Sequence, residues 1–263
     1  MLPPAVVLDP LLKLWLQEDI GRGDRTTSGL AAASLPGKAL WKAKAPGVIA
    51  GLPVAQRVFQ LLDSQSEFVP LVAEGDVCEP GQEIARITGS LSTLLMGERV
   101  ALNLAMRLSG IATLTRQFVE AIADLPVQLV DTRKTTPGLR ILEKHAVLVG
   151  GARNHRMGLD DGVMIKDNHI AAAGGIGAAI AQIRQAMPYP LTVEVETETL
   201  EQVQAAIHHG ADIIMLDNML PKTMAEAVQR IHTQAPHVKI EASGNITLQT
   251  IRPVAESGVD YIS

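Results

Sequence analysis

The segment TVEVETETLEQVQAAIHHGADIIMLD, residues 192–217, contains two apolar runs separated by a helical pattern. The runs TVEVE (192–196) and DIIMLD (212–217) are short, rich in β-branched residues and end in a carboxylate, which is typical of buried strands. The stretch 198–209 between them has helical apolar spacing and is followed by a glycine. Because a helix joins the two strands, the segment predicts a βαβ unit and a parallel sheet.

The same alternation of short apolar runs and helical patterns continues before and after this segment. Three more apolar runs end in a polar or charged residue, namely VQLVD (127–131), VMIK (163–166) and VKIEAS (238–243), and VDYIS reaches Ser263. Helical patterns cover 171–187, 221–234 and 246–257. Functional side chains at the carboxyl ends of strands favour a (β/α) barrel. A doubly wound open sheet is the second possibility, and it usually carries a glycine fingerprint after its first strand, which DTRKTTPGLR (131–140) does not match.

The residues before Pro126 have a different organisation. Residues 10–19 predict a short helix, and residues 38–89 consist of short β-branched runs between glycine and proline turns. Such a pattern is typical of a small sandwich-like sheet. A long helical pattern follows over roughly 93–123, and we expect it to break at Ser109–Gly110.

Composition excludes several classes of protein. With 263 residues, 47% hydrophobic and only 3% aromatic, the chain can bury a large aliphatic core. Its single cysteine, Cys78, excludes an intrachain disulfide and a CxxC metal site. No apolar run approaches the roughly 20 residues of a membrane span. A net charge of −5 argues against general nucleic-acid binding. We therefore expect a cytoplasmic protein with neither a membrane nor a nucleic-acid partner.

A dense group of cationic side chains interrupts this acidic chain. The motifs DTRKTTPGLR (131–140), GGARNHRMGL (150–159) and MIKDNHI (164–170) contain Arg133, Lys134, Arg140, Arg153, Arg156 and Lys166, with His155 and His169 among them. Guanidinium groups bind carboxylate and phosphate in bidentate fashion, and lysine acts as a point charge. The group predicts a small substrate with several carboxylates, phosphates or both. For any one of these residues alone, a solvated surface ion pair is the alternative.

The strand ends divide the charges into two arcs. Cations follow the first two strands, whereas Glu196, Asp217, Glu241 and Ser243 lie at the ends of the next three. Mg²⁺ prefers one or two carboxylates together with water and phosphate oxygens, so Glu196 and Asp217 are candidates to bind it or sugar hydroxyls. We expect a helix to begin at Thr247, where its free backbone N–H groups would form a phosphate cradle.

Together these motifs resemble those of the quinolinate phosphoribosyltransferases, also called nicotinate-nucleotide pyrophosphorylases (carboxylating). The resemblance runs through EDIGRGDRTT (18–27), GERVALN (97–103), the three cationic motifs, EVE (194–196), IIMLDN, EASGNIT and SGVDYIS. It implies the type II phosphoribosyltransferase fold, in which an N-terminal α/β sandwich is joined to an incomplete (β/α) barrel. We therefore expect a sandwich domain with its linking helix in residues 1–110 and a barrel domain with most of the active site in residues 111–263.

The resemblance also implies an activity. Members of this family are pentosyltransferases of NAD biosynthesis, which transfer the phosphoribosyl group of 5-phosphoribosyl-1-pyrophosphate to quinolinate with decarboxylation. The products are nicotinate mononucleotide, pyrophosphate and CO2. The implied cofactor is Mg²⁺, bound with the phosphoribosyl donor, and no organic cofactor or covalent nucleophile is expected. The implied assembly is a homodimer, or a higher oligomer, in which the sandwich of one subunit covers the barrel mouth of the other.

The roles of individual residues follow from the resemblance by position. Two carboxylates of quinolinate would be held by Arg133, His155, Arg156 and Lys166, with Thr132 assisting and Arg99 reaching in from the partner subunit. Lys134 and Lys166 would meet the phosphoribosyl donor. Glu196 and Asp217 would bind ribose hydroxyls and Mg²⁺, and Ser243 and Gly244 would receive the 5-phosphate. The catalytic group would thus be Lys134, Lys166, Glu196 and Asp217.

The family continues past VDYIS with a glycine-containing turn that completes its phosphate site and with a C-terminal helix. The resemblance therefore implies that this tail is missing here and that phosphate binding suffers. Two alternative functions remain. One is a paralogue with another acceptor, such as the protein found with molybdate-transport systems, although NHR (154–156) and KDNH (166–169) argue against it. The other is a non-catalytic binding protein that keeps the fold.

Overall fold

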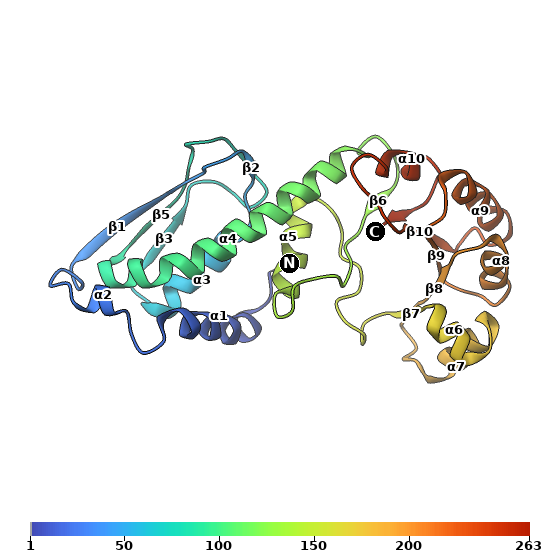
Figure 1. Cartoon of the computed structure of the whole chain (residues 1–263), viewed down its shortest axis with the longest axis horizontal. Helices are drawn as coiled ribbons and strands as arrows, with labels where there is room; N and C mark the ends of the chain where they lie inside the picture. Colours follow the sequence, from blue (N-terminus) through green and yellow to red (C-terminus); the bar gives the residue numbers. More distant parts are fainter. Residues whose placement is uncertain (1) are drawn as a thin grey trace. The chain divides into compact units, whose positions relative to one another are not determined.

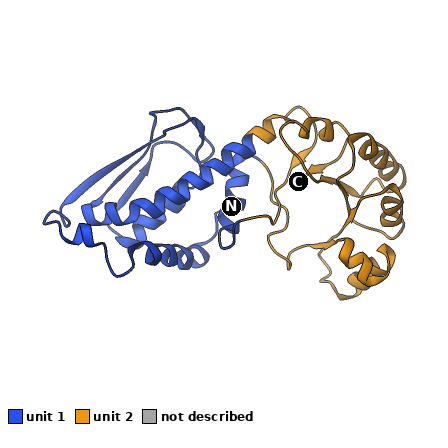
Figure 2. Ribbon diagram, in the orientation of Figure 1, with its two compact units in different colours: residues 1–116, 136–151 blue, residues 117–135, 152–263 orange. Residues whose placement is uncertain are grey.

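A computed structural model describes residues 2–263 and divides them into two compact units. Unit 1 runs through Arg116 and includes residues 136–151, and unit 2 comprises residues 117–135 and 152–263 (Figure 2). The boundary expected after residue 110 lies within one helix, six residues before this division. The segment 136–151 returns to unit 1 because its helix packs into that unit's core through Leu142 and Ala146.

Unit 1 contains a small antiparallel sheet and helices (Figure 1). Its strands are β1 (Pro36–Lys42), β2 (Gly47–Val48), β3 (Glu67–Pro70), β4 (Val77–Cys78) and β5 (Glu83–Ser90), paired as β1-β5-β3 and β2-β4. Its helices are α1 (Ala5–Ile20), α2 (Arg25–Ser28), α3 (Leu52–Leu62), α4 (Leu91–Glu120), whose last turn passes into unit 2, and α5 (Arg140–Gly150). The rings of Trp41, Phe59 and Phe68 pack together in its core, with centroids 5.6 to 6.3 Å apart. The sandwich-like sheet predicted for this part of the chain is therefore confirmed.

Helix α4 is continuous across Ser109–Gly110, so the break expected there is wrong. A glycine inside a helix costs about 1 kcal/mol relative to alanine, which is too little to interrupt a helix that is held by packing. Leu104, Leu108 and Ala112 bury one face of α4. The Ser109 hydroxyl also accepts a hydrogen bond from the Ala50 amide at 3.0 Å and donates one to the Ala50 carbonyl at 3.1 Å.

Two glycines of unit 1 provide a matched test of its packing. A Cβ added at Gly150 would lie 2.5 Å from Thr115 Cβ and 2.7 Å from the Ala112 carbonyl oxygen, whereas one added at Gly110 meets nothing within 4 Å. We expect Gly150→Ala to lower the free energy of unfolding by about 1–3 kcal/mol through overpacking. Gly110→Ala should raise it by roughly 0.5–1 kcal/mol through helix propensity. Urea unfolding measures both, and equal stability of the two variants would contradict the close packing of α4 against α5.

Unit 2 is built around a parallel sheet. Its strands are β6 (Gln128–Leu129), β7 (Val163–Ile165), β8 (Val193–Thr197), β9 (Ile213–Asp217), β10 (Lys239–Ser243) and β11 (Tyr261–Ile262), and its helices are α6 (Asp167–Ala173), α7 (Ile176–Ala186), α8 (Leu200–His208), α9 (Pro221–Gln234) and α10 (Ile251–Ala255). The strand order is β6-β11-β10-β9-β8-β7, and every printed pairing in this sheet is parallel. Successive strands from β7 to β11 are therefore neighbours, as in a barrel and without the reversal of a doubly wound sheet. Within residues 2–263 no pairing joins β6 to β7, so the barrel is incomplete.

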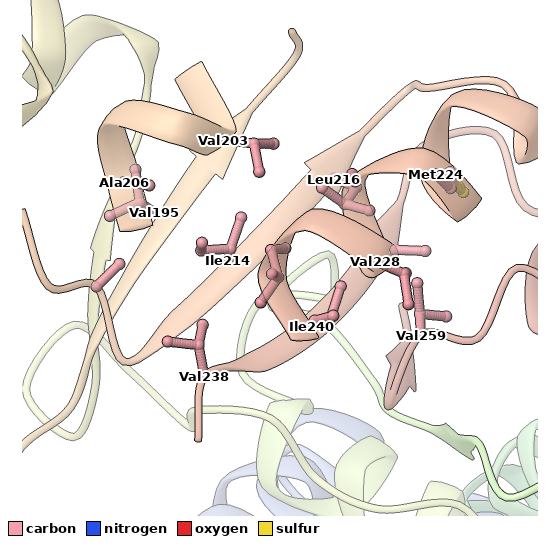
Figure 3. Packing of buried hydrophobic residues seen from close by; sticks show 14 of the residues in the cluster. Val195, Val203, Ala206, Ile214, Leu216, Met224, Val228, Val238, Ile240 and Val259 are labelled. Carbon is pink, nitrogen blue, oxygen red and sulfur yellow. The ribbon is translucent and has the colours of Figure 1, made fainter. Parts of the chain in front are cut away.

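The core of unit 2 lies between the sheet and its outer helices (Figure 3). Val195, Ile214 and Ile240, from three adjacent strands, are fully buried. Met224 and Val228 of α9 and Val203 and Ala206 of α8 pack over them. This core fixes the strand register, so the carboxyl ends of the strands meet at one edge of the sheet. None of the described helices is both long and apolar enough to cross a membrane.

Two helix predictions in unit 2 are corrected by local backbone chemistry. The single helix expected over 171–187 is two helices, because Gly174 and Gly175 have φ of +85° and +140° and end α6 before α7 begins. The helix expected from Thr247 begins only at Ile251. Thr247 and Thr250 instead exchange backbone and side-chain hydrogen bonds of 2.8 to 3.2 Å, which form a turn. A phosphate cradle at a helix beginning at Thr247 is therefore not formed.

Candidate active site

A cavity of about 520 Å³ opens at the carboxyl ends of the unit 2 strands. All site residues expected from the sequence line it except Arg99: Thr132, Arg133, Lys134, His155, Arg156, Lys166, Glu196, Asp217, Ser243 and Gly244. Arg99 is exposed on α4 in unit 1. The remaining lining includes Asp131, Met164, Asn218, Glu241 and Asn245. Residues separated by more than a hundred positions in the sequence thus converge because parallel strands end at the same edge.

Backbone pairing beside β6 brings the first two cationic motifs together. Arg153 N donates to Leu129 O at 2.9 Å, and Asp131 N donates to Arg153 O at 3.1 Å. The Asp131 carboxylate then accepts hydrogen bonds from Asn154 Nδ2 at 2.6 Å and from the His155 amide at 2.8 Å. Sequence reasoning treated Asp131 only as the end of a strand. Its position directly before Thr132 and Arg133 was the available signal of its role in holding both motifs together.

The cationic side of the cavity, called the cationic arc, contains the guanidinium groups of Arg133 and Arg156, which are partly buried. Arg133 Nε is buried and has no hydrogen-bond partner among the described residues. Arg156 donates through Nη1 to Gly162 O at 3.1 Å. Burial, and secondarily the charge of Arg133, lowers the pKa of Arg156 from its usual value. Two arginines that repel each other in a part-buried site favour an anion between them.

The acidic arc is linked to Lys166 and to an asparagine pair. Lys166 Nζ lies 2.6 Å from Glu196 Oε2. Asp217 Oδ2 accepts from Asn218 Nδ2 at 2.7 Å, and Asn218 Oδ1 accepts from Asn245 Nδ2 at 3.0 Å. These contacts join the ends of β9 and β10 in the cavity wall. Neither Asn218 nor Asn245 was expected to have a role, and their contact depends on the tertiary fold.

The turn after β10 requires an unusual backbone. Gly244 has φ of +101°, and a Cβ there would lie 2.2 Å from Asn218 Oδ1, so only glycine fits. Asn218 and Asn245 also have positive φ, of +52° and +53°. Asparagine tolerates this region better than most residues. The turn after Ser243 is therefore formed by positive-φ residues and not by a helix N-terminus, since α10 begins only at Ile251.

His155 is held from both sides of its ring. Its Nε2 lies 3.0 Å from Glu194 Oε2 and 3.4 Å from Glu241 Oε2, and its Nδ1 accepts from the Arg156 amide at 2.7 Å. Hydrogen bonds with Glu194 and then Glu241 raise the pKa of His155 to about 10. Burial is the main cause that raises the pKa of Glu194. Sequence analysis placed Glu241 in the ring of strand ends but did not connect either glutamate with His155.

Comparisons with known proteins agree over the whole described chain. A family model described as quinolinate phosphoribosyl transferase, N-terminal domain, matches residues 24–109, and its C-terminal counterpart matches residues 111–263. A Synechocystis protein named probable nicotinate-nucleotide pyrophosphorylase (carboxylating) is 58% identical over 262 residues, covering 100% of this chain and 88% of its own length. The human nicotinate-nucleotide pyrophosphorylase (carboxylating) is 41% identical over 266 residues, with coverage of 100% and 88%.

A solved structure gives the same result. The crystal structure of NadC from Streptococcus pyogenes has a TM-score of 0.94 and 43% sequence identity, covering 100% of this chain and 92% of that one. The fold of this chain, including both of its units, is therefore similar to that of a solved relative.

Proposed function

The chain belongs to the quinolinate phosphoribosyltransferase family, and from this membership we propose how its barrel mouth binds and transforms its substrates. It is a pentosyltransferase that joins quinolinate to the phosphoribosyl group of 5-phosphoribosyl-1-pyrophosphate with decarboxylation, a step of NAD biosynthesis. The observation that carries the assignment of residues is the convergence of the cationic motifs and the strand-end carboxylates on one cavity.

Quinolinate binds, in this proposal, to the cationic arc. Arg133 and Arg156 face its two carboxylates, with Lys166 and Thr132 beside them. The Nε of Arg133 supports this role, because it is buried without an acceptor among the described residues, and such a donor is costly until an anion supplies one. His155 contributes through Arg156, since both of its ring nitrogens already have partners within the chain.

Calorimetric binding of two pyridine acids tests the cationic arc. Quinolinate has two carboxylates and nicotinate has one. A site that holds two carboxylates should bind quinolinate at least roughly 30-fold more tightly than nicotinate. The reason is that one charged hydrogen-bonded partner is worth about 2 kcal/mol or more. Nicotinate bound as tightly as quinolinate would contradict the arrangement and favour a protein with another acceptor.

The phosphoribosyl donor binds, in this proposal, across the acidic arc and the turn after β10. Glu196 and Asp217 hold the ribose hydroxyls, Lys134 and Lys166 neutralise the pyrophosphate, and Ser243 and Gly244 receive the 5-phosphate. The two carboxylates also fit Mg²⁺, because the ion takes few protein oxygens and completes its shell with water and phosphate. When bound, Mg²⁺ would supply charge neutralisation to the leaving pyrophosphate.

The chemistry requires positioning and electrostatics from these residues. As the pyridine nitrogen attacks the anomeric carbon, positive charge develops on the ribose, and the carboxylates of Glu196 and Asp217 stabilise it. Lys134 and Lys166 stabilise the departing pyrophosphate. The ring nitrogen is then positively charged, so the carbanion left by loss of the adjacent carboxylate as CO2 is stabilised next to it. The arginines hold the ring in the attacking orientation throughout.

We also propose a homodimer in which Arg99 completes the partner's cationic arc. Its exposure on α4 supports a role outside its own unit. Arg99→Ala and Lys166→Ala should each lose activity, and mixing them under conditions of subunit exchange should restore up to about a quarter of the wild-type sites, because heterodimers form half of the mixture and carry one intact site. Turnover of the mixture measures this. Activity no higher than that of either parent, with exchange demonstrated by mass spectrometry, would contradict the shared site.

A further inference from the structure

The segment 157–162 is closed into a loop by one carboxylate. Asp161 Oδ2 accepts a hydrogen bond from the Met157 amide at 2.7 Å, and Asp161 Oδ1 accepts one from the Gly158 amide at 2.9 Å. Most side chains of the loop are exposed, and Leu159 is 76% exposed. Because the loop buries little apolar surface, its shape depends on hydrogen bonds of this kind.

Both ends of this loop act on Arg156. Met157 follows Arg156 directly in the chain, and the Gly162 carbonyl accepts a hydrogen bond from Arg156 Nη1 at 3.1 Å. Within residues 2–263 this carbonyl is the one oxygen that the guanidinium contacts. Gly162 also lies against the stem of the arginine, because a Cβ added there would be 3.1 Å from Arg156 Cβ and 3.4 Å from its Cδ. Asp161 therefore ties the residue after Arg156 to the residue before its acceptor.

Asp161 is not part of the cavity that is proposed to bind the substrates. Arg156 lines that cavity, whereas neither Asp161 nor Gly162 belongs to its lining in the described part of the chain. These two residues line a second cavity of about 330 Å³, which Arg156 also borders. An effect of Asp161 on substrate binding would therefore pass through Arg156.

We propose that Asp161 is a positioning residue for quinolinate binding, which holds the loop in the form in which the Gly162 carbonyl orients the guanidinium of Arg156. The inference rests on the proposed binding of quinolinate by Arg156. A guanidinium binds a carboxylate through two parallel N–H groups, so its orientation decides the strength of the pair. A displacement of about 1 Å at such a contact can cost on the order of 10²-fold in rate.

The sign of the effect separates positioning from charge. Asp161 adds a negative charge to the cavity that it shares with Arg156. If only this charge mattered, its removal would leave the site more positive, and quinolinate with its two carboxylates would bind more tightly. Loss of positioning predicts the opposite result, which is weaker binding of quinolinate.

Asp160 provides the matched control for this charge. It precedes Asp161 in the same loop and is also exposed. Within residues 2–263 its carboxylate has no hydrogen-bond or ion-pair partner. Asp160→Ala therefore removes the same charge from the loop without opening it, and this variant should follow wild type.

The first experiment measures KM for each substrate in wild type, Asp161→Ala, Asp161→Asn and Asp160→Ala. Asp161→Ala should raise KM for quinolinate by roughly tenfold, the factor that one charge-assisted hydrogen bond is worth, and leave KM for the phosphoribosyl donor unchanged. Asp161→Asn keeps one acceptor oxygen and should lie between Asp161→Ala and wild type. An Asp161→Ala enzyme whose KM for quinolinate is unchanged or lower would overturn the proposal. An equal rise in both KM values would overturn it too, because that result indicates general loosening of the fold.

A second variant repeats this test without removing a charge. Gly162→Ala should displace the stem of Arg156, because the added Cβ comes closer to it than packed atoms normally do. We expect the same selective rise in KM for quinolinate. This variant also decides the question if Asp161→Ala does not fold, since a wild-type KM for quinolinate in folded Gly162→Ala would contradict the control of Arg156 by the loop.

The second experiment is a double-mutant cycle of quinolinate binding, measured by calorimetry. Asp161→Ala should weaken binding in wild type and cause no further loss in Arg156→Ala, because it acts through that arginine. An equal loss in both backgrounds would refute the positioning role. If Arg156→Ala weakens binding and Asp161→Ala does not, the positioning role alone fails. If Arg156→Ala binds quinolinate as wild type does, the proposed substrate site fails and the positioning role fails with it.

Discussion

Arg133→Ala lowers kcat/KM for quinolinate by roughly 30-fold to several-thousand-fold, because truncating one partner of a desolvated charge pair costs about 2–5 kcal/mol. The alanine leaves a quinolinate carboxylate facing Arg156 without its second guanidinium. KM for the phosphoribosyl donor should change little, since the donor is proposed to bind the opposite arc. Steady-state kinetics with each substrate varied in turn measures both effects.

The matched control for this change is Arg230→Ala. Arg230 lies on α9 and pairs with Glu226 at 2.6 Å, and both side chains are exposed. Exposed pairs of this kind contribute about 0–1 kcal/mol to stability and should not affect turnover. A folded Arg133→Ala enzyme with wild-type KM for quinolinate would remove Arg133 from the site.

Asp217→Asn lowers kcat by about 10²–10³, because the change removes one negative charge from the place where positive charge develops in the transition state. The amide is isosteric and can rotate to accept from Asn218 Nδ2, so the local hydrogen bond survives. Quinolinate binding should be retained. A higher Mg²⁺ concentration should also be required for half-maximal rate if Asp217 binds the ion.

Glu226→Gln is the corresponding control, since it neutralises an exposed carboxylate on α9. Rapid-quench measurement of a single turnover separates the chemical step from product release. An Asp217→Asn enzyme whose single-turnover rate equals that of wild type would show that the charge of Asp217 does not act on the transition state.

The parallel sheet was predictable because each strand carries its own local evidence. Val193 and Val195 alternate with Glu194 and Glu196, and the next strand is an unbroken apolar run, so burial on one or both faces follows from sequence spacing. The carboxyl-terminal placement of Glu196 and Asp217 follows directly from the strand ends. This is why most of the expected site residues meet in one cavity.

The sequence was less informative where packing or side-chain caps override local propensity. Helix α4 continues through Gly110 because the residues before and after this glycine, such as Leu108 and Ala112, are buried and hold the helix in place. No local sequence pattern predicts that packing. At Thr247 two threonines form a hydrogen-bonded turn that delays α10. The pairing of Glu194 with Glu241 through His155 depends on strand order and on the return of residues 151–156 beside β6, so it is a property of the tertiary structure alone.

The most direct test of the central claim is turnover by the purified chain. Quinolinate, phosphoribosyl pyrophosphate and Mg²⁺ are supplied, and nicotinate mononucleotide and released CO2 are measured together, with Arg133→Ala as the paired variant. We predict equal amounts of the two products from wild type and a loss of both in the variant. A folded Arg133→Ala enzyme that forms nicotinate mononucleotide at the wild-type rate would contradict the account. So would a folded wild-type enzyme that binds both substrates and forms none.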